Sequence, residues 1–533
     1  MSLRNYIHTI KYLKMEQLYF QIYYKLRAKL RKMLGRKEKY TYYKRGNHIS
    51  FFSFPEKTES YKGNDTFEFL NLTHRFCGVW DDRELGDLWR YNLNYMDFIL
   101  QPGMTVADSV RWMECFIDAV HDNRIATDPY PISLRGVNWI KFVSFHRDEL
   151  TDTQLCKIDT SLYSQYRILN RCTERHLLAN HYLENGFSLL FAAVYFNDKT
   201  FWRKAKYIVE HQLKEQILDD GAHYELSPMY HCIILERLLD CYNLLCSVDD
   251  SSFDGLPAMR NLLTEKASRM LAWLDAIVVA DDSIPLLNDS AYGVALLPCE
   301  LREYATRLGL EWSCGVLGDS GYRRVIRSGY EVVLDMANLG VSYNLGHAHA
   351  DSATFLLWVK GRELLVEAGT STYSAGERRN YERSTRAHNT VALDGENSSK
   401  VWGAFRCAQR AQTEILEDGP DVFTLSHSGY VQKGLDCRRS FVCNGDSVEI
   451  IDVIVGNSQY VAEAYFHLSP EVKVLSIDGN CVVVDGAVFS FEGCKSLQLI
   501  QVNVAKEYNV LRPTTCICVS FDDRLHTVIN GFD

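Results

Sequence analysis

The sequence predicts a multidomain α+β protein, with an N-terminal (α/α) toroid or incomplete barrel followed by a C-terminal antiparallel β-sandwich. Apolar residues recur at helical spacing between about residues 64 and 310. After about residue 321, short apolar runs alternate with Gly, Asp and Asn turns, which is typical of strands. The 533 residues, 47% of them hydrophobic, exceed one ordinary domain. We therefore expect an N-terminal segment at 1–45, the toroid at 46–315 and the sandwich at 316–533.

The N-terminal segment is basic and amphipathic. It holds 13 basic and 2 acidic residues, although the whole chain has a net charge of −10. Apolar residues follow helical spacing over 12–34, and the basic residues near its end are Lys25, Arg27, Lys29, Arg31 and Lys32. Such a helix can make a peripheral contact with an anionic membrane surface. The more common alternative is a helix packed on the toroid with its basic side in water.

In the helical region the breaks fall at turn residues. Gly, Pro and Asp cluster at 101–103, 128–131 and 219–221, which predicts turns between helices of medium length. Many such helices with short connections favour a toroid over a simple bundle. In the second half, the runs at 330–336 and 448–455 predict strands of an antiparallel sandwich.

No signal-peptide pattern and no apolar run of membrane-spanning length is visible in the sequence. The sixteen cysteines are scattered and form no C-x-x-C pair, as expected of reduced thiols. We therefore expect a cytoplasmic protein, or one associated with the cytoplasmic membrane, with the periplasm as the alternative.

The densest group of chemistry-bearing residues is G-H-A-H-A-D at 346–351. His347 and His349 are two positions apart and would face the same side of a strand. Together with a carboxylate they suit a metal or acid–base site, whereas the alternative is a hydrogen-bonded turn. Downstream, Glu367 and His388 could complete a His-His-carboxylate metal site with His349.

Four arginines follow that group, at Arg378, Arg379, Arg383 and Arg386. Guanidinium groups match the geometry of carboxylate and sulfate, so these residues could bind an anionic polymer. The alternative is ordinary ion pairing with Glu377 and Glu382.

Two segments stand out in the helical half. Asn180, His181 and Glu184 share a helical face, although Asn180 could be a cap and His181 a satisfied buried residue. Ser227-Pro228 predicts a helix start with Tyr230 in its first turn. There the helix N-terminus could lower the pKa of the phenol, but a packing role is the alternative.

These segments, in this order, resemble the heparinase II/III-like polysaccharide lyases over nearly the whole chain. The most specific stretches are G-H-A-H-A-D, E-A-G-T-S-T-Y and R-S-T-R-A-H-N-T-V, with N-H-Y-L-E-N-G and E-L-S-P-M-Y-H in the helical half. The resemblance implies cleavage of a uronic-acid-containing glycan by β-elimination. It assigns Asn180 to neutralising the uronate carboxylate, with His181 in support. It makes Tyr230 the acid and a candidate base, His347 the partner base, and Tyr373 a further candidate.

The resemblance also implies binding roles. The expected substrate-binding residues are Trp89, Asn138, Trp139, Glu184, Arg379, Arg383 and Arg386. His349, Glu367 and His388 would hold a structural divalent metal, expected to be zinc, although the family often has Asp where this chain has Glu367. We expect an anionic polysaccharide and no nucleic acid as the partner. The alternatives are a non-catalytic glycan-binding or capsule/O-antigen assembly protein, and a metal-dependent glycan hydrolase.

Overall fold

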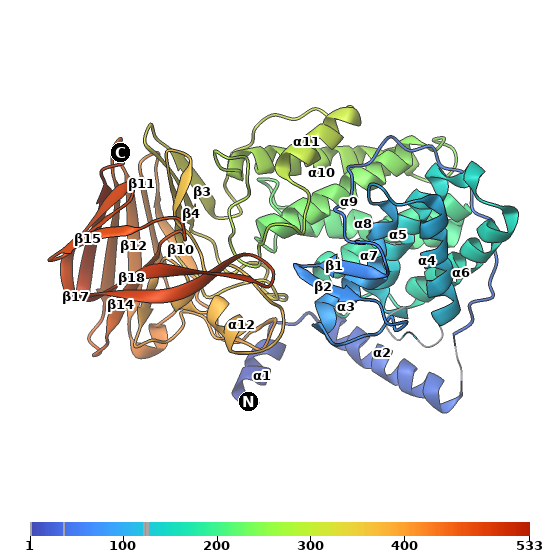
Figure 1. The fold of residues 1–533 in the computed structure, drawn as a ribbon. Helices are drawn as coiled ribbons and strands as arrows, with labels where there is room; N and C mark the ends of the chain where they lie inside the picture. The colour runs from blue at the N-terminus through green and yellow to red at the C-terminus, as the bar shows by residue number, and fades with distance from the viewer. Residues whose placement is uncertain (1–2, 36–37, 121–122, 124–126, 533) are drawn as a thin grey trace.

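The computed structural model describes residues 3–35, 38–120, 123 and 127–532. Helices occupy one half of the molecule and strands the other (Figure 1), which confirms the predicted fold class. The helices of the first half are α1 (Leu3–Ile10), α2 (Met15–Met33), α3 (Gly86–Tyr95), α4 (Val106–Ala119), α5 (Pro129–Phe145), α6 (Asp152–Arg171), α7 (Ala179–Phe196), α8 (Lys199–Gln216), α9 (Pro228–Cys246), α10 (Leu256–Ile277) and α11 (Pro298–Arg307).

The centre of the helical domain is formed by α5 and α7. Both helices are apolar around most of their circumference, so they are buried rather than amphipathic. In α7 every residue is buried except His181. This burial fixes the position of the polar side chains that α7 carries into the domain, because they can move only with the packed helix.

One part of the predicted helical region is a hairpin instead. Strands β1 (Thr66–Phe69) and β2 (Leu72–Arg75) pair antiparallel across a two-residue turn. Leu70 and Asn71 have φ of 54° and 62°, and positive φ at both central residues is the turn that matches strand twist. The prediction that the helical pattern already begins at about residue 64 was wrong here, because Leu70 gave no sign of this turn conformation.

The second half is a sandwich of two main sheets. The smaller sheet has four strands, β3 (Tyr322–Ile326), β4 (Tyr330–Asp335), β5 (Phe355–Val359) and β6 (Arg362–Leu365). The larger sheet is ordered β10-β11-β12-β13-β18-β17-β16-β15, with β14 pairing both β18 and β7. Its strands are β7 (Val391–Leu393), β10 (Thr413–Asp418), β11 (Val422–His427), β12 (Asp436–Cys443), β13 (Val448–Val455), β14 (Ala462–His467), β15 (Val474–Asp478), β16 (Cys481–Val484), β17 (Ala487–Glu507) and β18 (Val510–Asn530).

The two sheets share one apolar core. Alternate residues of β12 and β13 point inward, and Phe441 of the large sheet contacts Phe355 of the small one with ring centroids 5.5 Å apart. A short helix, α12 (Glu377–Glu382), and a two-stranded ribbon, β8 (Val401–Trp402) with β9 (Arg406–Cys407), lie outside these sheets.

The hairpin of β17 and β18 reaches from the sandwich to the helical domain (Figure 1). At its tip, the side chain of Asn509 donates to the carbonyl of Leu70 at 2.8 Å, and that of Asn71 donates to the carbonyl of Tyr508 at 3.0 Å. The tip therefore fixes Tyr508 at the junction of the domains.

The N-terminal segment touches both domains. Thr9 of α1 receives a hydrogen bond from the indole of Trp402 at 3.3 Å, while Tyr24 of α2 donates to the carbonyl of Thr173 at 2.6 Å. Among the residues described, none of the helices combines the length and hydropathy needed to cross a membrane.

Candidate active site

Two tyrosines and a histidine meet at the junction of the domains. Tyr230 comes from the first turn of α9, where Ser227 caps the helix and Pro228 takes the first position, as the sequence predicts. His347 and Tyr373 come from loops of the sandwich. The hydroxyls of Tyr230 and Tyr373 are 3.2 Å apart, and the ring centroids of Tyr230 and His347 are 4.0 Å apart. The structure thus brings together three of the five predicted catalytic residues.

The carboxylate of Asp289 holds this group in place. Asp289 lies in the loop between α10 and α11 and is completely buried. One oxygen is 2.9 Å from Nδ1 of His347, and the other is 2.9 Å from Nε2 of His349. The guanidinium of Arg379 pairs with both oxygens, with Nη2 at 2.6 Å from Oδ2. A loop of the helical domain therefore orients three side chains of the sandwich.

The pKa values of this group follow from burial and charge. Burial alone would raise the pKa of Asp289, but Arg379 and hydrogen bonds from the two histidines hold it well below its usual value. Burial raises the pKa of Tyr230 well above that of a free phenol, and it does the same at Tyr373, where Tyr230 adds to the effect. The predicted lowering of the Tyr230 pKa by the helix N-terminus was wrong because desolvation is the larger effect.

Asn180 and His181 lie at the start of α7. The side chain of Asn180 donates to Glu225 at 2.7 Å, and Glu225 stands in the loop that leads to Tyr230. The ring of His181 is partly exposed, lies 3.1 Å from Oε1 of Glu174 and packs on Tyr130. Burial would lower the pKa of His181, but Glu174 outweighs it and the net pKa is raised. His181 is therefore a candidate cation beside the Asn180 amide.

Several predicted substrate-binding residues lie in the core instead of an open cleft. Trp89 and Trp139 are 3% and 0% exposed. The Trp89 indole donates to the carbonyl of Leu72, and Trp139 packs edge-on against Phe116. Asn138 is buried as well and donates to the backbone of α3. Since α5 is buried on all sides, its polar residues face protein and not solvent.

Most of the charged residues predicted to bind substrate are also buried and paired within the protein. Glu184 is 1% exposed and lies 3.5 Å from Nε of Arg237 in the interior of the helical domain. Arg379 pairs with Asp289, and Arg383 donates to backbone carbonyls, including that of Ala348 at 2.9 Å. The predicted pairing of these arginines with Glu382 is made by Arg378 at 2.7 Å. Of the three predicted arginines, Arg386 is the exposed one.

A second buried group lies directly beside the first. Ligand atoms of His349, Asp351 and His388 all lie within 4.8 Å of one another. In each residue one atom lacks a hydrogen-bond partner within the described residues, namely Nδ1 of His349, Oδ2 of Asp351 and Nε2 of His388. Two imidazole nitrogens and a carboxylate oxygen are a donor set that suits a divalent ion.

The structure places Glu367 behind this group and not in it. Glu367 hydrogen bonds to Nδ1 of His388 and accepts from the hydroxyl of Thr354. Asp289 stands in the same relation to Nε2 of His349. Carboxylates that hold the outer nitrogen of a ligating histidine are typical of metal sites. Asp351, from the G-H-A-H-A-D stretch, is thus the third candidate ligand in place of Glu367.

Asp289 and Tyr508 are the residues that the sequence reasoning missed. Asp289 belongs to the polar triplet Asn-Asp-Ser at 288–290, which directly follows an apolar run. The change from apolar to polar residues at this point was the available sign that a polar group is buried there. Tyr508 is 3% exposed and contacts Tyr373 with ring centroids 5.3 Å apart, but its position in a hairpin turn gave no such signal.

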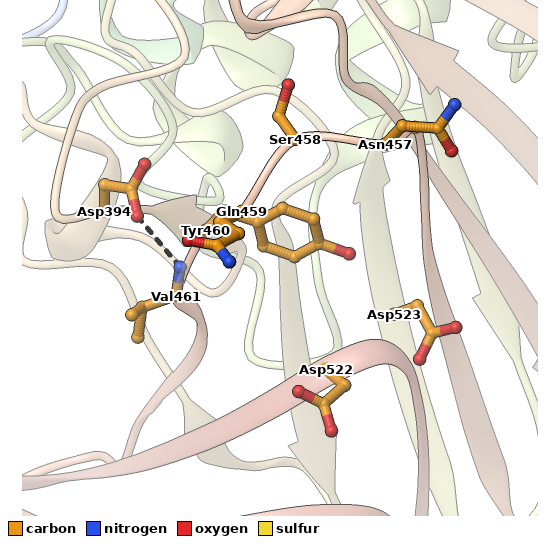
Figure 2. A pocket seen from close by; sticks show the side chains of 9 residues that line it. Asp394, Asn457, Ser458, Gln459, Tyr460, Val461, Asp522 and Asp523 are labelled. Atoms are coloured by element: carbon orange, nitrogen blue, oxygen red, sulfur yellow. Dashed lines mark hydrogen bonds between the residues drawn. The ribbon is translucent and has the colours of Figure 1, made fainter.

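A separate hollow lies on the surface of the sandwich, lined by Asp394, residues 456–461, Asp522 and Asp523 (Figure 2). Its volume is ≈ 670 Å³, and Asp394 accepts a hydrogen bond from the Val461 amide at 2.8 Å. None of the lining residues belongs to the tyrosine–histidine group. The candidate active site therefore rests on the geometry of that group and not on the size of a hollow.

Two family models match the chain. The model described as heparinase II/III N-terminus covers residues 118–307, and the one described as heparinase II/III-like, C-terminal, covers residues 313–530. The heparin-sulfate lyase of Pedobacter heparinus is 25% identical over 317 residues, which are 53% of this chain and 46% of that protein. The heparin-sulfate lyase of Bacteroides stercoris is 22% identical over 311 residues, 52% of this chain and 44% of that protein. The alignments thus span less than half the length of these relatives.

Solved structures show the same fold. The crystal structure of heparinase III has a TM-score of 0.63 at 16% identity, covering 83% of this chain and 76% of that one. A mutant of the heparan sulfate lyase HepC from Pedobacter heparinus has a TM-score of 0.57 at 18% identity, covering 88% of this chain and 81% of that one.

Proposed function

Since this chain belongs to the heparinase II/III-like family, we propose that it is a polysaccharide lyase that cleaves a uronic-acid-containing glycan by β-elimination. The observation that carries the proposal is the meeting of Tyr230, His347 and Tyr373 at the domain junction. β-Elimination needs a neutralised carboxylate, a base for the C5 proton and an acid for the departing oxygen. Each of the three functions has its own candidate residues.

Charge neutralisation falls to Asn180 and His181. An amide can donate to the uronate carboxylate, and a histidine whose pKa is raised by Glu174 can add a positive charge. Lowering the charge of the carboxylate makes the C5 proton more acidic, because the carbanion that forms can delocalise into it.

The proton transfers fall to His347 and Tyr230. With Nδ1 of His347 donating to the ionised Asp289, Nε2 is the nitrogen that can accept a proton. Tyr230 has a raised pKa and keeps its proton, so it suits the acid that protonates the leaving oxygen. Tyr373, at 3.2 Å, can hold the phenol in position by hydrogen bonding.

The substrate class follows from the chemistry and from the relatives. The curated relatives are heparin-sulfate lyases, whose substrate is an anionic polymer. For this chain we propose an anionic uronic-acid polysaccharide, with a bacterial surface polysaccharide as one candidate. A non-catalytic binder would not need proton-transfer residues in hydrogen-bond contact, so their presence favours an enzyme.

We further propose a divalent metal, with zinc as the first candidate, at His349, Asp351 and His388. Three unpartnered ligand atoms in a buried site support this. When bound, the ion would supply positive charge that orders the loop carrying His347. The proton transfers themselves use only protein side chains.

The test is the ultraviolet absorbance of the unsaturated uronate during incubation with a panel of uronic-acid polysaccharides. The panel includes heparan sulfate, heparosan, hyaluronan, alginate and bacterial capsules. We expect a rise with at least one polymer that Tyr230→Phe abolishes. Tyr224→Phe is the matched control, because Tyr224 is a buried tyrosine that also has a tyrosine partner, Tyr343, at 3.0 Å. Near-normal activity of Tyr230→Phe would overturn the assignment, and no rise with any polymer would overturn the lyase proposal.

A further inference from the structure

The helix α2 packs on the toroid with its polar side. Besides Tyr24, Gln17 donates to the carbonyl of Leu177 at 3.2 Å and Arg27 to that of Arg171 at 2.6 Å. Arg175 of the helical domain lies over the ring of Phe20 and pairs with Glu16. The inner side of α2 is therefore held mainly by hydrogen bonds and charge, which is the reverse of an ordinary surface helix.

The outer side of α2 carries an apolar stripe, which we call the α2 stripe. Its members recur at intervals of three and four residues and, at 3.6 residues per turn, lie within about 100° of one another. They are exposed to solvent by 78%, 62%, 60%, 43%, 62%, 56% and 75%, in the order Met15, Tyr19, Ile22, Tyr23, Leu26, Leu30 and Met33. Contiguous exposed apolar surface of this kind marks an interaction site.

Basic side chains flank the α2 stripe on both sides. Lys25, Lys29 and Lys32 are exposed on one flank, and Arg27 and Arg31 lie on the other. This cationic border contrasts with the net charge of −10 of the whole chain. Long basic side chains can bury their stems in an apolar layer while their charged ends reach its polar rim.

The preceding helix, α1, also exposes apolar side chains. Ile7 and Ile10 of α1 are 60% and 49% exposed, and Figure 1 shows α1 and α2 along the same edge of the molecule. Lys14 fixes the joint between them through Glu215 and the ring of Tyr343. The apolar surface is thus held by both domains rather than by a free tail.

We propose that the α2 stripe is a docking surface for an anionic lipid bilayer. An apolar face of about one quarter of the helix, bordered by Lys and Arg, is the composition of helices that lie in the interface of such a membrane. Charge complementarity selects this partner: the basic border matches anionic headgroups, while a second copy of this chain would bring a basic border against a basic border.

The experiment is flotation of the full chain with phosphatidylcholine vesicles, with and without phosphatidylglycerol. We expect strong binding with phosphatidylglycerol, weak binding without it, and loss of binding as salt rises. Ile22→Glu/Leu26→Glu should lower the partition coefficient by at least about 100-fold, since it removes two large apolar groups from the interface. Lys25→Glu/Lys29→Glu should remove the preference for phosphatidylglycerol.

The matched control is Val455→Glu/Leu475→Glu, which places the same charges at residues 53% and 64% exposed on the sandwich. It should bind as the unaltered chain does. All variants change exposed residues, and thermal unfolding checks that they are folded. Absence of binding to phosphatidylglycerol vesicles, or equal binding by Ile22→Glu/Leu26→Glu, would overturn the proposal. The proposal would also be overturned if light scattering showed that the unaltered chain is a dimer, that Ile22→Glu/Leu26→Glu is a monomer, and that neither binds vesicles. Cleavage of a soluble polymer should be unchanged in these variants, so this test is separate from that of the lyase.

Discussion

Oδ2 of Asp289 lies 2.9 Å from Nδ1 of His347. The contact joins residues 58 positions apart and crosses from the helical domain to the sandwich. An ionised acceptor at Nδ1 selects the tautomer in which Nε2 is basic. Asp289 is therefore a positioning residue for the proposed base.

Asp289→Asn should lower kcat by about 1,000-fold or more, because an amide can donate to Nδ1 and favour the other tautomer. It also leaves Arg379 without its charged partner, so the free energy of unfolding should fall by about 3–5 kcal/mol. The measurements are steady-state kinetics on the folded fraction and urea unfolding. Asp159→Asn is the control. Asp159 is also buried and hydrogen-bonded, but its partners are the amide of Gly46 and the hydroxyl of Tyr195 and not His347. A similar kcat for both variants would remove the positioning role of Asp289.

Metal content gives a second prediction. Purified protein should contain one divalent ion per chain, and chelation should lower Tm because the bound ion stabilises the native state. Asp351→Asn should abolish binding, whereas Glu367→Gln should weaken it by about 10–100-fold, as expected of a residue that orients a ligand. Elemental analysis and metal titration measure both effects. If Glu367→Gln lost the metal while Asp351→Asn kept it, Glu367 would be the ligand and Asp351 the residue behind it.

Glu184 predicts a pH dependence of stability. Burial raises its pKa to about 7, despite the opposing charge of Arg237. Between the pKa of an unfolded glutamate, about 4.3, and that value, the folded chain binds a proton that the unfolded chain does not. Stability from this group is therefore present at low pH and is lost as pH rises toward 7.

Glu184→Gln mimics the protonated form, so this variant should lack the pH-dependent loss. The fall in its free energy of unfolding up to pH 8 should be smaller by about 2–3 kcal/mol. Urea unfolding from pH 5 to pH 8 measures it. Glu463→Gln, a partly buried residue of the sandwich, should leave the slope unchanged. An unchanged slope in Glu184→Gln would show that Glu184 is ionised throughout this range.

The sequence was sufficient for the elements that local patterns specify. The period of apolar residues predicted the helices, and the Ser227-Pro228 pair predicted the start of α9. The runs at 330–336 and 448–455 became β4 and β13. These features depend on neighbours within a few positions, which a single sequence displays.

Features that depend on distant partners could not be predicted. Asp289 acquires its role from residues 58 to 90 positions away. Asp351 and Glu367 are both carboxylates between His349 and His388 in the sequence, and only the path of the chain decides which one joins His349. From the sequence alone Trp139 was predicted to line a substrate cleft. Only the structure shows that α5 is buried on all sides. The pattern of α2 was visible, but not that its apolar side faces outward.

The contact of Thr9 with Trp402 joins residues 393 positions apart. A ribosome therefore completes α1 long before it makes the ribbon β8–β9 on which α1 rests. Contacts of such separation form late, since the intervening chain must first be made and folded. The earliest synthesised helix of the described chain therefore cannot dock until the ribbon β8–β9, more than 390 residues later, has been made.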